Sequence, residues 1–106
     1  NKPETPSRAI LSGLGIDSVF FNVVGGDTLP VKKPNPQGVL YLHRQANIGL
    51  QETLLIGDSR IDYDTGMAAG VAVCGVTWGF GAADFTLLSP HFVVATADQL
   101  RAVILA

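Results

Sequence analysis

The chain has 106 residues, which is room for one small domain at most, since a typical domain takes about 100 to 200 residues. Hydrophobic residues make up 47% and charged residues only 15%, against a usual charged share of about 25%, so we expect part of the apolar surface to meet a partner. The net charge is −2 with no run of Lys or Arg, which excludes an electrostatic surface for nucleic acid or an anionic membrane.

The same composition indicates the compartment. Residues 1–6 contain no apolar leader, and no stretch approaches the roughly 18 apolar residues of a membrane span. The single cysteine, Cys74, has no internal partner and lies in an apolar run, which is typical of a small buried side chain. We therefore expect a soluble cytoplasmic protein that binds a small molecule.

The first half of the chain predicts helix, strand, loop and helix. Apolar residues at helical spacing come after Pro6, with terminating glycines close behind. Residues 19–24 are β-branched and aromatic and run into two glycines, which predicts a buried strand. Residues 27–36 carry three prolines and form a loop, and Asn35-Pro36 opens a helix that we expect Gly49 to close.

The second half predicts strands at residues 53–56, 71–76 and 92–94. Asp58-Ser59 caps the start of a helix that stops at Gly70, and Thr96 caps the last helix. This alternation indicates an α/β fold, with a Rossmann-like parallel sheet covered by helices on both faces. Ligands of such sheets bind at the carboxyl ends of the strands, so functional residues should lie in loops 25–36, 57–59 and 77–83.

Two carboxylates stand at the end of the strand at 53–56. Asp58 comes directly after the strand and Gly57, and Asp62 comes one helical turn later, so both carboxylates can converge above the sheet. Oxygen ligands of this kind suit Mg²⁺. The alternative is that Asp58 is only a helix cap and Asp62 only a first-turn residue that complements the helix dipole.

Lys33 lies in the loop that leaves another strand end. Its ammonium can neutralise a phosphate or an ionised aspartate. The alternative is an ordinary solvated lysine, a role that suits Lys32 equally well.

The whole set of motifs resembles one family. Residues 25–27, 31–36, 54–62 and 68–71 resemble, in order and spacing, the C-terminal half of phosphatases of the haloacid dehalogenase superfamily, and phosphoglycolate phosphatases are the nearest group within it. The opening Asn1-Lys2-Pro3 resembles the segment directly after the family's second motif, and residues 75–81 resemble its glycine-aromatic loop. Ile61 departs from the pattern, because a polar residue is usual there.

The resemblance implies a site and its chemistry. Family members form an aspartyl-phosphate with the help of Mg²⁺. By analogy Lys33 is the catalytic lysine that steadies phosphate and nucleophile, Asn1 borders the phosphate pocket, Asp58 is a metal ligand and Asp62 supports the metal site. The substrate expected is a small phosphorylated metabolite.

The nucleophile is missing from residues 1–106. The family's Asp-x-Asp-Gly-Thr segment occurs nowhere, and residues 62–66 imitate it with Thr and Gly exchanged and no strand in front. We therefore interpret the chain as the C-terminal part of a single core domain, without the central nucleophile strand and the cap domain. Its strand edges would expose unpaired backbone, so we expect it to need the missing segment or another chain, and to be inactive alone.

Three functions stay open at this point. The first is a phosphatase for a small metabolite such as phosphoglycolate. The second is a sugar-phosphate mutase of the same superfamily. The third is a truncated, non-catalytic binding or interaction module. His43 and His91 lack further ligands at metal-binding spacing and are interpreted as structural.

Overall fold

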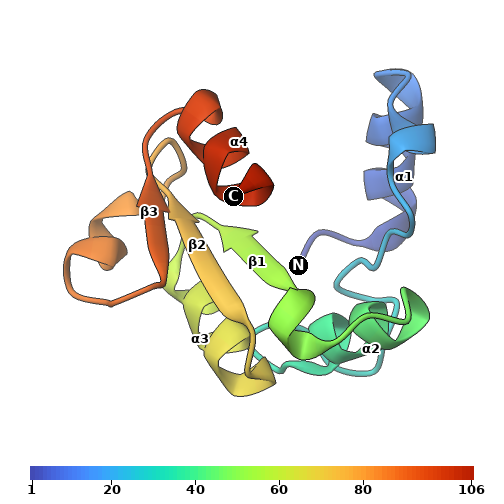
Figure 1. The fold of residues 1–106 in the computed structure, drawn as a ribbon. Coiled ribbons are helices and arrows are strands. Elements are labelled where there is room, and N and C mark those ends of the chain that lie inside the picture. The colour runs from blue at the N-terminus through green and yellow to red at the C-terminus, as the bar shows by residue number, and fades with distance from the viewer.

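The computed structural model describes residues 1–106. Four helices and three strands succeed one another along the chain, separated by three short 3₁₀ turns. The helices are α1 (Glu4–Gly13), α2 (Gln37–Gln45), α3 (Arg60–Ala69) and α4 (Ala97–Leu105). The strands are β1 (Leu54–Gly57), β2 (Ala72–Val76) and β3 (Phe92–Val94) (Figure 1). None of the helices combines the length and apolar character that crossing a bilayer requires.

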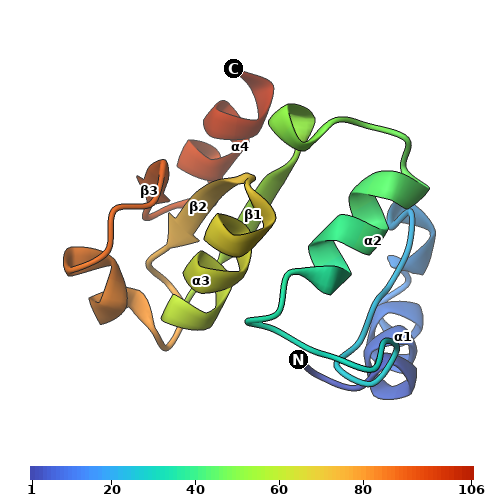
Figure 2. The same cartoon turned by 90° about the horizontal axis from the view of Figure 1, so that it is seen from below.

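The strands form one parallel sheet in the order β1-β2-β3. Side chains alternate across β2: Val73 meets Gly66 of α3, whereas Cys74 and Val76 pack with Leu100 of α4. Helices α3 and α4 therefore cover opposite faces, as Figure 2 shows. The predicted α/β class with helices on both faces is confirmed.

Local signals explain why α3 forms where the sequence predicts it. Gly66 lets the helix approach the sheet closely, because a Cβ there would collide with the side chain of Val73. Gly70 ends the helix in the left-handed conformation at φ 75°, which a glycine adopts without steric cost. The two glycines thus determine how closely α3 packs on the sheet and where the helix ends.

The predicted strand at residues 19–24 is wrong. Asp17–Val19 forms a 3₁₀ turn, and the residues after it pair with no strand. Val19 and Phe21 are 75% and 70% exposed. Strand propensity reports a side chain's fit to a pleated surface, and the sheet supplies no neighbour here. The segment therefore stays unpaired although its composition favours a strand.

The second predicted helix starts one residue late and ends early. The Asn35 side chain accepts a hydrogen bond from the backbone N–H of Gln37 at 3.0 Å, but the cap position itself falls on Pro36, which makes no side-chain cap bond. The helix stops at Gln45 rather than near Gly49, because Asn47 takes the left-handed conformation at φ 57°. Asparagine adopts this conformation more readily than most residues, so it ends the helix before the glycine is reached.

The molecule is open for its size. Its accessible surface is 6816 Å², whereas a compact chain of 11.1 kDa would expose about 5,700 Å². Helix α1 stands away from the sheet (Figure 1), and the N-terminal part meets the sheet mainly where α2 packs on α3. Strand β1 pairs with β2 only, so its other edge is free.

Candidate functional site

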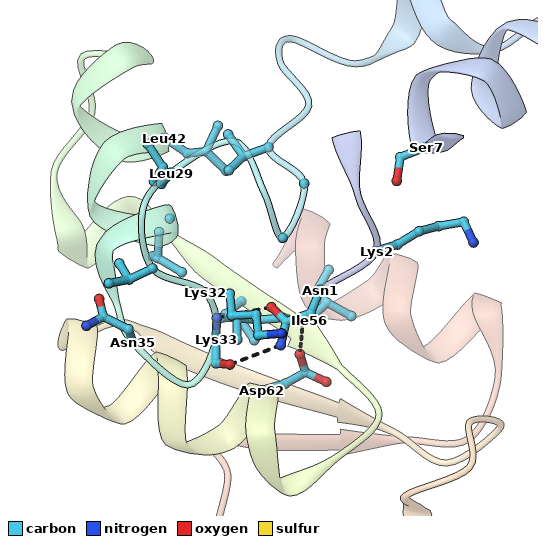
Figure 3. A pocket seen from close by; sticks show the side chains of 17 residues that line it. Asn1, Lys2, Ser7, Leu29, Lys32, Lys33, Asn35, Leu42, Ile56 and Asp62 are labelled. Atoms are coloured by element: carbon cyan, nitrogen blue, oxygen red, sulfur yellow. Dashed lines mark hydrogen bonds and ion pairs between the residues drawn. The ribbon is translucent and has the colours of Figure 1, made fainter. Parts of the chain in front are cut away.

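Lys33 and Asp62 form the central ion pair of the site. The Lys33 ammonium nitrogen Nζ lies 2.6 Å from Oδ1 of Asp62, and the two residues come from the loop before α2 and from the first turn of α3 (Figure 3). The Asp62 side chain is 8% exposed and that of Lys33 is 38% exposed. A cation with one side open to solvent therefore stands beside a buried carboxylate, at the carboxyl end of β1.

The other oxygen of Asp62 is also engaged. Oδ2 accepts hydrogen bonds from the backbone N–H groups of Asp58 at 3.0 Å and Ser59 at 3.3 Å, and from the Ser59 hydroxyl at 3.2 Å. Gly57 leaves room for this carboxylate, because a Cβ at Gly57 would collide with it. Asp62 therefore acts as a first-turn residue of α3, as the alternative interpretation proposed, and it also contacts Lys33.

These contacts determine the protonation of Asp62. Burial raises the pKa of this carboxyl, but the hydrogen bond and charge of Lys33, with the N–H groups of Asp58 and Ser59, outweigh burial and hold the pKa below its ordinary value. Asp62 is consequently ionised at neutral pH, and it fixes the Lys33 ammonium in one place.

Asp58 has a different neighbour. Its Oδ2 accepts a hydrogen bond from the backbone N–H of Phe80 at 3.2 Å, and Oδ1 has no hydrogen-bond partner. A Cβ at Gly79 would collide with the Asp58 carboxylate, so this glycine lets the loop after β2 close onto it. The alternative that Asp58 caps α3 is wrong, because Ser59 occupies the cap position.

Asn1 contacts the lysine loop through its side chain. Oδ1 accepts from the backbone N–H of Lys33, and Nδ2 donates to the backbone carbonyl of Lys33, both at 3.0 Å. Asn1, Lys33 and Asp62 line one cavity of about 380 Å³ (Figure 3). Asp58 is outside its lining. The structure thus joins three of the four predicted residues in one cavity, with the fourth linked to them through its backbone N–H.

Some contacts of the site are not predictable from the sequence. Asp84, which no motif of the sequence singles out, accepts a hydrogen bond from the backbone N–H of Arg60 at 3.0 Å and so supports the start of α3. Phe80 contributes its backbone N–H, which no side-chain pattern reveals. The glycines on either side of it are the only sequence signal that this loop approaches another part of the backbone closely. His43 and His91 bond to backbone groups of Ile48 and Val73.

The carboxylates of the site fit magnesium in part. Hard cations prefer oxygen ligands and Mg²⁺ commonly keeps several waters, and Asp58 offers one carboxylate oxygen free of hydrogen bonds. Both oxygens of Asp62 are occupied, which suits a supporting role. No group of three or more His, Cys, Asp or Glu residues stands together to hold a metal, so these residues fit one side of a metal shell.

The segment that imitates a nucleophile motif lies on a helix. Residues 62–66 fall within α3, where the Asp62 carboxylate is held by Lys33 and by backbone N–H groups. Asp64 pairs with Arg60 at 3.4 Å on the exposed side of the helix. The likeness of residues 62–66 to the nucleophile motif is therefore one of sequence alone, because a helix carries these residues instead of the end of a strand.

A parallel sheet between two helical layers places the chain among the α/β proteins, whose ligands bind at the carboxyl ends of the strands, where Lys33 and Asp62 lie. The family comparison is more specific. The model of the haloacid dehalogenase-like hydrolase family matches residues 1–76. The chain belongs to this family.

Relatives narrow the resemblance further. The chain is 38% identical over 105 residues to a phosphoglycolate phosphatase of Pseudomonas putida, covering 98% of this chain and 38% of that protein. It is 37% identical over 101 residues to one of Colwellia psychrerythraea, covering 94% of this chain and 45% of that protein. It therefore spans less than half the length of these curated relatives.

A solved structure agrees with the sequence relatives. The crystal structure of a predicted phosphoglycolate phosphatase from Haemophilus somnus superposes with a TM-score of 0.87 at 32% identity, over 97% of this chain and 47% of that one. The expected membership of the haloacid dehalogenase superfamily, nearest to phosphoglycolate phosphatases, is confirmed.

Proposed function

We propose that the protein containing this chain is a magnesium-dependent phosphatase of a small phosphorylated metabolite, with phosphoglycolate as the favoured substrate. Residues 1–106 would form the C-terminal part of its single core domain. The relatives named as phosphoglycolate phosphatases support the substrate class. A reducing compartment such as the cytoplasm suits the buried free thiol of Cys74.

The ion pair of Lys33 and Asp62 is the observation that carries the proposal. A lysine that neutralises a phosphate must hold its charge at a fixed point, and Asp62 holds Nζ at 2.6 Å. Because the Lys33 side chain is still 38% exposed, a phosphate oxygen can approach the ammonium from the cavity. The same cavity gives the organic part of a small substrate a place beside it.

The chemistry we propose is displacement at phosphorus by an aspartate outside this chain. Its carboxylate oxygen forms a bond to phosphorus while the bond to the substrate's ester oxygen breaks, and water then releases phosphate from the aspartyl-phosphate. Lys33 offsets the negative charge of phosphate and nucleophile throughout. Mg²⁺, bound by Asp58 with Asp62 in support, would supply further positive charge.

We propose that the segment missing from residues 1–106 lies along the free edge of β1. Two cavities flank the free edge of β1: the first is lined in part by Leu55 and Ile56, and a second of about 340 Å³ by Phe21, Leu42 and Leu54 among others. We propose that an extended segment of the longer protein pairs with β1 here, since unpaired strand edges favour such pairing. Its end would then lie beside Lys33 and Asp62, and residues 1–106 alone would have no turnover.

The test is an assay of the full-length protein. With phosphoglycolate and Mg²⁺ we expect release of inorganic phosphate, and we expect none from the purified 106-residue chain. If the protein instead converts a sugar phosphate to its isomer without releasing phosphate, its function is that of a mutase and not of a phosphatase. Absence of both reactions in the full-length protein, with Mg²⁺ present, would leave the non-catalytic interaction module as the function.

A further inference from the structure

The side-chain amide of Asn1 forms two hydrogen bonds to the backbone of Lys33. Its amide oxygen accepts from the Lys33 N–H and its amide nitrogen donates to the Lys33 carbonyl, each at 3.0 Å. An asparagine amide has one oxygen and one nitrogen, and here each of them is bonded to the same peptide backbone. Such a reciprocal pair fixes both the position and the orientation of the lysine's main chain.

Asn1 is itself held in place by the first strand-end loop. The backbone N–H of Gly26 donates to the carbonyl of Lys2 at 2.8 Å, and a Cβ at Gly26 would collide with the backbone carbonyl of Asn1. The N–H of Glu4 donates to Asp27 at 2.8 Å. The segment before α1 is therefore held against residues 25–27 by contacts that do not involve Lys33.

Lysine needs such support more than most residues. Its flexible four-carbon side chain loses much rotamer freedom when it is fixed, and the loop around Lys33 belongs to no helix or strand. Asp62 holds the ammonium end of the side chain, and Asn1 holds the backbone end. With both ends fixed, Nζ has few alternatives to its place above β1.

We propose that Asn1 is a positioning residue for Lys33 rather than a phosphate ligand. This deepens the proposed function and rests on it, since a fixed Lys33 matters only if its ammonium meets the substrate. Asn1 thereby takes a role different from the phosphate-bordering one that the sequence implied. Its amide acts on the reaction through the backbone of Lys33.

The experiment compares three variants of the full-length protein, Asn1→Ala, Asn1→Asp and, as a control, Asn22→Ala. Asn22 also accepts a backbone hydrogen bond, from Val23, but does not touch Lys33. Hydrogen exchange at the Lys33 amide is measured by NMR, because this readout does not depend on activity. We expect faster exchange in Asn1→Ala, and retained protection in Asn1→Asp, which keeps the acceptor oxygen, and in the control.

Steady-state kinetics provide the second readout. Misplacing a catalytic group by about 1 Å costs about 100-fold in rate, so Asn1→Ala should lower kcat by up to that factor. The inhibition constant of inorganic phosphate should rise only together with faster exchange at Lys33, because in this proposal Asn1 acts on phosphate only through that lysine. A marked rise in that inhibition constant with unchanged exchange at Lys33 would make Asn1 a phosphate ligand and overturn the proposal. If the wild-type protein has no turnover, the exchange result still decides whether Asn1 fixes the backbone of Lys33.

Discussion

Lys33 and Asp62 lie 29 residues apart in sequence, yet the ammonium nitrogen of one is 2.6 Å from a carboxylate oxygen of the other. The pair joins the loop before α2 to the first turn of α3, and so links the N-terminal part of the molecule to the sheet. Removal of the charge of Lys33 would affect both the proposed chemistry and this link.

Lys33→Met in the full-length protein should lower kcat by about 100- to 1,000-fold, the usual loss when one group that stabilises the transition-state charge is removed. It also leaves the Asp62 carboxylate without its cation, at a cost near the lower end of about 1 to 3 kcal/mol, since water can enter where Lys33 was partly exposed. Phosphate release and thermal melting measure the two effects. Lys32→Met is the matched control, because Lys32 has no bonded side-chain partner; equal losses in both variants would contradict a special role of Lys33.

The elements between residues 54 and 76 are the part of the fold that the sequence predicts best. Their signals are local: an apolar run before Gly57, small residues on α3, and Gly70 in the left-handed conformation. The strand expected at 19–24 failed because pairing depends on a neighbour elsewhere in the chain or outside it. Propensity carries no information on whether that neighbour is present.

The sequence predicted which residues form the candidate site, but not which partners their side chains contact. Strand-end position selected Asp58, and the spacing to Asp62 selected the second carboxylate. The direction in which each carboxylate points depends on loops far away in sequence: Phe80 for Asp58 and Lys33 for Asp62. A one-turn spacing fixes which helix face two residues share, but not the partners that tertiary packing brings to them.

Asp58→Asn should abolish magnesium-dependent turnover of the full-length protein, with a loss of at least about 100-fold. Magnesium should also raise the melting temperature of the wild-type protein, since binding to the native state stabilises it, and this increase should vanish in the variant. Asp64→Asn is the matched control, because Asp64 pairs with Arg60 on the exposed side of α3. A magnesium-induced melting shift that persists in Asp58→Asn would remove Asp58 from the metal site.

Gly79→Ala should disturb the site through Asp58. A Cβ at this position would collide with the Asp58 carboxylate, and overpacking of this kind typically costs about 1 to 3 kcal/mol. We expect lower stability in urea and weaker magnesium dependence of turnover. Gly13→Ala, at the last residue of α1 with nothing near its added Cβ, should keep the activity of the wild-type protein. Equal magnesium responses in Gly79→Ala and the wild type would show that the loop yields without moving Asp58.

Glu4 anchors α1 and should titrate below its ordinary pKa of 4.5. Hydrogen bonds from Thr28 and Arg8 lower the pKa of this carboxyl and outweigh its desolvation. A lowered folded-state pKa stabilises the protein above pH 4.5, and this contribution is lost as the pH falls through the folded-state value. In an NMR titration Thr28→Val should raise the pKa of Glu4, whereas Thr86→Val, whose hydroxyl bonds to Ala83, should leave it unchanged. An unchanged Glu4 pKa in Thr28→Val would mean that this hydrogen bond does not form in solution.

The free edge of β1 should behave differently in the chain alone and in the longer protein. Leu54 to Ile56 pair with β2 on one side only, so backbone N–H groups on the other side should exchange rapidly with solvent in the 106-residue chain. Pairing with the segment outside the chain should slow them by orders of magnitude in the full-length protein. Hydrogen exchange followed by mass spectrometry of peptides over residues 53–57 makes the comparison, with β2 as internal reference. Equally fast exchange at β1 in both proteins would show that no strand adds at this edge, and the cavities beside β1 would then have to accommodate side chains or ligand instead.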